Sequence, residues 1–99
     1  MTFEQHVERA LASLPPDIAR ALENLAIVVE DENPEEPDLL GLFEEQEFLP
    51  AKITIYRLPL VESFPHPAEL EREIRITVLH ELAHYFGIDE GRLTELGYE

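Results

Sequence analysis

Two histidines separated by one helical turn carry the clearest chemical signal in this sequence. Residues 80–84 read HELAH, which is the HExxH pattern. On a helix, residues i and i+4 lie one above the other, so His80 and His84 can present both imidazoles to one cation. Zn²⁺ binds such nitrogens at about 2.0–2.1 Å and keeps a position for water in catalytic sites. Glu81 lies on the flank of the same helix, where its carboxylate can act as a general base towards that water.

The residues that follow the pattern offer a third ligand for the same cation. Residues 80–90 read HELAHYFGIDE, and Gly87 allows the chain to turn sharply after the helix. Such a turn brings an acidic side chain back towards the histidines, with Glu90 as the first candidate and Asp89 as the second. Two alternatives stay open at this point. In the first alternative, Glu90 is an ordinary solvated carboxylate. In the second, the two histidines form a pair at a helix end that binds no metal.

The helix that positions these residues is predicted to run from Pro67 to Phe86. Proline is favoured at a first helical position, and Gly87 is a natural C-terminal stop. The first half of this segment is charged and amphipathic, whereas the second half, ITVLHELAHYF, is apolar on most sides. The second half is therefore expected to pack against the rest of the protein rather than stand in solvent.

A strand predicted over residues 52–60 (KITIYRLPL) is the clearest extended element. Ile53, Ile55 and Arg57 alternate onto one face, and Pro59 ends the strand or places it at a sheet edge. Shorter patterns predict a helix over 2–13 capped by Thr2 and Gln5, a helix over 18–24 capped by Asp17, a strand over 26–30, an acidic loop over 31–38, and a turn leading into a brief strand or 3₁₀ element over 39–43.

These elements predict an α/β fold of the mixed α+β kind, with a small mixed sheet packed on the long helix that carries HExxH. The 99 residues are expected to form a single domain, 1–99, because domains commonly contain about 100–150 residues. His6 is expected on the surface of the first helix, and His66 in the loop that enters the long helix.

Composition narrows the classes of function and partner. The absence of cysteine excludes disulfides, thiolate metal sites and a cysteine nucleophile. The net charge of −15 favours basic peptides, unfolded basic proteins and divalent cations, and it disfavours nucleic acid and membrane surfaces. An acidity that serves only solubility is the alternative. No signal-peptide pattern and no apolar run of about 20 residues is present, so we expect a soluble, cytoplasmic protein. The sequence does not indicate an oligomeric state.

The extended pattern, HExxHxxGxx followed by a ligand, resembles the zinc signature of the metzincin metallopeptidases. In that family the last position is usually His and sometimes Asp, whereas here it is Glu90. The only methionine is Met1, so the methionine turn of that family is absent and the chain is not a true metzincin.

The sequence is more similar to small bacterial zincin-like proteins, often called minimal zincins. The similarity lies in three segments, ALENLAIVVEDENPEEPDLLGLFE, ITIYRLPL and REIRITVLHELAHYFGIDEGRLTELG, which together cover most of the chain. This resemblance implies a compact zincin-like core with a Zn²⁺ site on the HExxH helix, and it implies no particular substrate. Peptidases of this type also need a donor that stabilises the oxyanion, for which the sequence offers Tyr56, Arg57, Tyr85 and Tyr98.

Three functional hypotheses follow. The first is a small zinc metallopeptidase that binds an extended peptide along an edge strand, residues 53–58, and uses Glu81 as its base. The second is a metal-binding protein of the same fold without efficient catalysis, because so short a chain has little protein to shape specificity pockets. The third is an acidic interaction module that binds a basic partner through residues 30–38 and 44–47. The presence of Glu81 favours the first, since a structural site needs histidines but no base.

Overall fold

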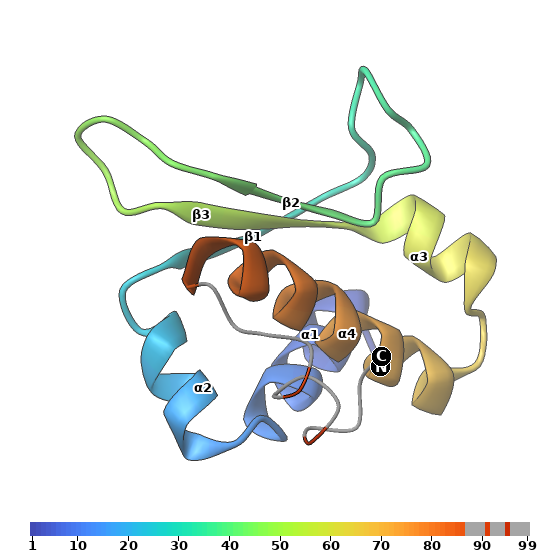
Figure 1. The fold of residues 1–99 in the computed structure, drawn as a ribbon. Coiled ribbons are helices and arrows are strands. Elements are labelled where there is room, and N and C mark those ends of the chain that lie inside the picture. Colours follow the sequence, from blue (N-terminus) through green and yellow to red (C-terminus); the bar gives the residue numbers. More distant parts are fainter. Residues whose placement is uncertain (87–90, 92–94, 96–99) are drawn as a thin grey trace.

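The predicted mixed α+β class is confirmed by a computed structural model, which describes residues 1–86, 91 and 95. Within these residues a small sheet lies on one side and the helices gather mainly against its other side (Figure 1). The elements in chain order are α1 (Phe3–Ala12), α2 (Pro16–Leu22), β1 (Ala26–Glu30), β2 (Gly41–Glu44), β3 (Lys52–Tyr56), α3 (Arg57–Ser63) and α4 (Pro67–Phe86).

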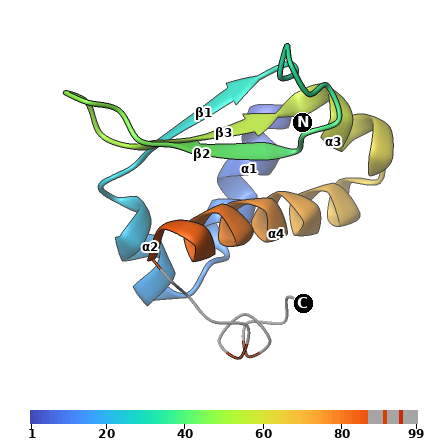
Figure 2. The same cartoon turned by 45° about the horizontal axis from the view of Figure 1, so that its top comes forward.

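The sheet has the strand order β1-β3-β2, so β3 is its central strand. β1 pairs with β3 in parallel and β2 pairs with β3 antiparallel, which makes the sheet mixed, as expected. Ile53 lies opposite both Ile27 and Phe43, and Ile53 and Ile55 have no exposed surface. Figure 2 shows α1 and α4 beneath the sheet, where this apolar core lies.

The prediction for residues 52–60 is correct for the first half of that segment and wrong for the second. The strand ends at Tyr56, and α3 begins at Arg57. Pro59 is the third residue of α3, where the missing N–H costs no hydrogen bond because the first turn of a helix leaves its N–H groups unpaired. Residues 53–58 also do not form an edge strand, since β3 is flanked on both sides. The edges of the described sheet are β1 and β2.

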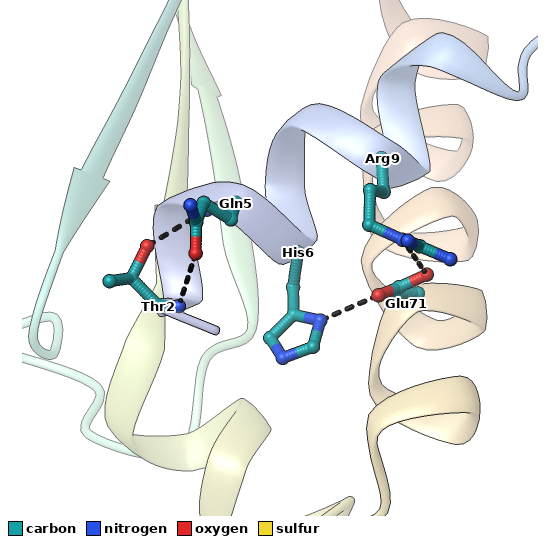
Figure 3. Close-up of polar contacts among 5 residues, drawn as sticks. All are labelled: Thr2, Gln5, His6, Arg9 and Glu71. Carbon is teal, nitrogen blue, oxygen red and sulfur yellow. Dashed lines mark hydrogen bonds and ion pairs between the residues drawn. The ribbon is translucent and has the colours of Figure 1, made fainter.

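The N-terminal helix begins as the sequence predicts. Thr2 caps α1 by accepting a hydrogen bond from the Gln5 amide (3.2 Å), and the Gln5 side chain accepts one from the Thr2 amide (2.8 Å), as Figure 3 shows. The cap predicted for the next helix is wrong. α2 begins at Pro16, with Pro15 as its capping residue, and Asp17 lies within its first turn.

Helices α1 and α4 are joined by a polar cluster beside the core. Nδ1 of His6 donates to Glu71 at 2.6 Å, and Nε of Arg9 donates to the other carboxylate oxygen of Glu71 at 3.2 Å (Figure 3). His6 is buried, so its expected surface position is wrong. The hydrogen bond from His6 is the largest cause that lowers the pKa of Glu71; Arg9 lowers it further, and burial opposes both.

Helix α4 has the bounds predicted from the sequence. One side of this helix forms the centre of the core, and His66 lies exposed just before its start. The buried apolar residues of α4 are Leu70, Ile74, Val78, Leu79 and Leu82. None of the described helices combines the length and the apolar character that crossing a membrane requires.

Candidate active site

The two histidines of HExxH lie on the solvent side of α4, near its C-terminal end. Leu79 and Leu82 on the same stretch of helix are fully buried, and this fixes the rotation of the helix so that His80 and His84 are exposed. Within the described part of the chain, neither imidazole has a hydrogen bond or ion pair. No described residue thus occupies either ring, and their spacing of one turn suits a single metal ion.

Glu81 is directed towards the sheet rather than into solvent. Its Oε1 accepts a hydrogen bond of 2.8 Å from the main-chain amide of Phe43, in strand β2. The Glu81 residue is half-buried, so this contact is partly sheltered from water. The carboxylate of HExxH is thereby tied to an edge strand of the sheet, and its second oxygen has no such bond in the described residues.

Strand β2 approaches α4 very closely at Gly41. A Cβ atom placed at Gly41 would lie 2.5 Å from Cγ2 of Thr77, 3.3 Å from the carbonyl oxygen of Thr54 and 3.9 Å from Cγ of Glu81. Any side chain larger than hydrogen would thus collide with the helix one turn before HExxH. Glycine at this position lets the strand lie directly over the helix.

A second contact holds β2 against the end of α4. The rings of Phe43 and Tyr85 are 4.5 Å apart between centroids, with planes inclined by 32°. This spacing is within the range of favourable aromatic pairs. Tyr85 follows His84 directly and is 43% exposed, so it borders the site and also contacts solvent.

A pocket of about 310 Å³ opens between the segment that leads into β2 and the face of α4. It brings His80 and Glu81 together with Asp38, which comes from the acidic loop. Imidazole and carboxylate are donor types that Zn²⁺ accepts, so the residue types of the lining suit a cation, although these three groups are not arranged around a single ion. The full lining consists of Asp38, Leu39, Leu40, Gly41, Thr77, His80 and Glu81.

Two of the suggested oxyanion donors do not line this pocket and contact other residues. The hydroxyl of Tyr56 is buried and accepts a hydrogen bond from Asn33 (3.0 Å), and the guanidinium of Arg57 donates to Asp31 at 2.9 and 3.0 Å. Of the described candidates, Tyr85 alone is on the helix that carries the histidines.

The remaining predicted site residues lie outside the described residues. These are Glu90, Asp89 and Tyr98. Among the residues that the structure does describe, no group of three or more histidine, cysteine, aspartate or glutamate side chains is arranged to hold a metal ion. The role of Glu90 as third ligand therefore stays a prediction.

Sequence reasoning missed three contributors to the site. Asp38 was hidden among the many acidic residues of its loop, and the Phe43 amide belongs to the main chain, which no residue type announces. Gly41 did carry a signal, since a glycine within the apolar run LLGLF indicates a close approach of backbone.

Comparison with protein families finds a match over most of the chain. Residues 22–98, which include β1, β2, β3 and α4, match the family described as zincin-like metallopeptidase. Among curated proteins, none matches the sequence.

Proposed function

The chain belongs to the zincin-like metallopeptidases, and on this premise we propose that it hydrolyses peptides with zinc held by His80, His84 and Glu90. Membership of the family implies a zinc protein in general terms. The proposal adds the particular ligands and assigns the general base to Glu81. The observation that supports it most is the position of Glu81, whose carboxylate lies in the same pocket as His80 and is tied to an edge strand.

Each residue of the proposed site has a separate task. His80 and His84 bind the cation through ring nitrogens, which must be unprotonated to do so. Bound zinc acts as a Lewis acid towards water and towards the peptide carbonyl. Glu81 accepts a proton from the attacking water and passes it to the leaving amine, a transfer typically worth about 10²–10⁴-fold in rate.

The proposed substrate is an extended, basic peptide that lies along the outer edge of β2. Of the two edges of the described sheet, only β2 contributes a residue, Gly41, to the pocket that holds His80 and Glu81. Addition of a strand to the main-chain groups of this edge that Glu81 does not occupy would give affinity through hydrogen bonds, without a deep cleft. The net charge of −15 attracts a basic chain and adds no preference for a particular sequence.

A metal-binding protein without efficient catalysis is the second candidate. The pocket of about 310 Å³ lies at the lower end of the range for small-molecule sites, so it offers little surface for gripping a side chain. This candidate requires the histidines but gives Glu81 no chemical task.

One experiment separates the two candidates. The zinc-loaded protein is incubated with a diverse peptide library, and products are identified by mass spectrometry. We expect slow cleavage of unfolded basic peptides by the parent and none by Glu81→Gln. The control is Glu69→Gln, the same change at an exposed position in the first turn of α4, which should cleave like the parent. Absence of cleavage by the parent at high concentration would favour the metal-binding protein, and equal cleavage by Glu81→Gln would show that Glu81 is not the base.

A further inference from the structure

We propose that the main-chain N–H of Phe43 is a positioning group for Glu81, so that the edge strand sets the orientation of the general base. This inference rests on the proposed function for its catalytic meaning. Its structural basis is the 2.8 Å hydrogen bond from the Phe43 amide to Oε1 of Glu81.

The direction of the strand makes this amide available. Tyr56 N donates to the carbonyl of Leu40 at 3.0 Å, so the main-chain groups of Leu40 are directed at the neighbouring strand β3. These groups alternate in direction along an extended chain. Those of Leu42 therefore also face β3, whereas the N–H groups of Gly41 and Phe43 face away from it. The Phe43 N–H is thus not used in the hydrogen bonds between β2 and β3, and it donates to Glu81 instead.

The strand is held against the helix on both sides of this bond. On one side, Gly41 lies so near Thr77 that no Cβ fits between them. On the other side, the ring of Phe43 packs on Tyr85 at 4.5 Å. These contacts fix the amide relative to α4, so the donor is a rigid point for a flexible carboxylate.

A fixed donor on one oxygen restricts how the Glu81 carboxylate can turn. With Oε1 held by Phe43, the carboxylate rotates little about its own axis, and Oε2 keeps one direction for accepting a proton. A glutamate side chain otherwise samples many rotamers, and holding it in a single arrangement removes that freedom before the reaction begins. Loss of the donor should therefore slow proton transfer and leave peptide binding largely intact.

Two substitutions at one position isolate the N–H. Phe43→Ala and Phe43→Pro both remove the ring, but only proline also removes the amide hydrogen. Proline is tolerated at an edge position whose N–H faces away from the sheet. We expect kcat of Phe43→Pro to be about tenfold below that of Phe43→Ala, a part of the factor that a positioned carboxylate supplies. KM and zinc affinity should be alike in the two variants, and equal kcat values would overturn the proposal.

Hydrogen exchange tests the same bond without substrate or activity. The Phe43 amide should exchange slowly in the parent, slowly in Glu81→Gln, which keeps an acceptor oxygen, and fast in Glu81→Ala, as measured by NMR. Fast exchange in the parent would overturn the proposal even if Phe43→Pro fails to fold. If the parent cleaves no peptide and the amide is nevertheless protected by Glu81, the proposed function fails while the contact stands. If the parent cleaves peptides and the Phe43 amide exchanges fast, the proposed function stands while the positioning contact fails.

Discussion

A methyl group at Gly41 would lie 2.5 Å from Cγ2 of Thr77, so strand β2 rests directly on helix α4 at this point. Thr77 cannot easily turn aside, because its hydroxyl donates to the carbonyl of Glu73 at 2.8 Å. We expect Gly41→Ala to lower the free energy of unfolding by about 1–3 kcal/mol, the usual effect of overpacking a well-filled interface. Urea denaturation followed by circular dichroism measures the change.

Thr77→Ser provides the control for this prediction. Serine removes Cγ2 and keeps the hydroxyl that donates to Glu73. Gly41→Ala should therefore cost less in the Thr77→Ser background than in the parent, and a double-mutant cycle measures the difference. An equal loss in both backgrounds would show that the collision with Thr77 is not the cause.

Zinc binding should depend on both histidines of HExxH. Replacing His80 or His84 by alanine removes one of two imidazoles that can share an ion. We expect zinc affinity to fall by more than about 100-fold in each variant, beyond the loss usually caused by changing a residue that only supports a ligand. The measurement is competition with a zinc chelator on protein purified without a histidine tag. His66→Ala, an exposed histidine just before α4, is the matched control and should bind zinc like the parent.

The third ligand can be assigned by comparing two neighbouring carboxylates. Glu90 occupies the position after Gly87 that carries a ligand in the extended signature, whereas Asp89 precedes it. Glu90→Gln should weaken zinc binding in the same competition assay, because an amide oxygen carries no charge to offset that of the ion. Asp89→Asn should leave the zinc affinity unchanged. The opposite ranking would make Asp89 the ligand, and no effect of either change would leave the ion with ligands other than these two.

Glu71 should make folding stability depend on pH in the acid range. Its pKa in the folded protein lies below the ordinary value of 4.5, chiefly because His6 donates a hydrogen bond to the carboxylate and also because Arg9 does so. A group with a lowered pKa stabilises the fold fully above its unfolded pKa, and this contribution is lost as pH falls through the folded pKa. The parent should therefore exceed Glu71→Gln in stability at neutral pH, and the gap should narrow as pH falls below 4.5 and close only below the lowered pKa of the folded protein.

Thermal unfolding of both proteins across pH 2–7 measures that gap, with the common effects of the other carboxylates cancelling in the difference. The contribution of His6 can be checked in the same way. His6→Phe removes the donor and keeps an apolar ring. In the His6→Phe background, the stability lost on Glu71→Gln should therefore depend less on pH than it does in the parent. A difference between parent and Glu71→Gln that stays constant with pH would contradict the prediction.

Elements whose signals are local were predicted well from the sequence. The bounds of α4 follow from Pro67, a residue favoured at a helix start, and from Gly87, a residue type that commonly follows a helix end. The cap of α1 follows from Thr2 and Gln5. The boundary between β3 and α3 was missed because the apolar segment around Pro59 is compatible with both states. Distant contacts decide it there, including the hydrogen bond of 2.9 Å from Leu58 N to the carbonyl of Asp31.

In the candidate site, too, the features with local signals were predicted and the contacts between distant residues were not. His80, Glu81 and His84 lie within five residues of one helix, so their arrangement is a consequence of helical geometry. The partner of Glu81 belongs to a strand 38 residues away and is a main-chain amide, so neither spacing nor residue type could indicate it. Likewise the burial of His6 depends on Glu71, which is 65 residues distant in the sequence.

Helix α1 precedes the stretch of chain that matches the family, which begins at residue 22. Its apolar residues nevertheless belong to the same core as Ile74 and Val78 of α4, and its polar side joins α4 through Glu71. A protein shortened to the matched stretch would expose this side of α4 to water, and exposed apolar surface of that kind promotes aggregation. The region of family similarity is thus smaller than the unit that must fold to hold the HExxH helix in place.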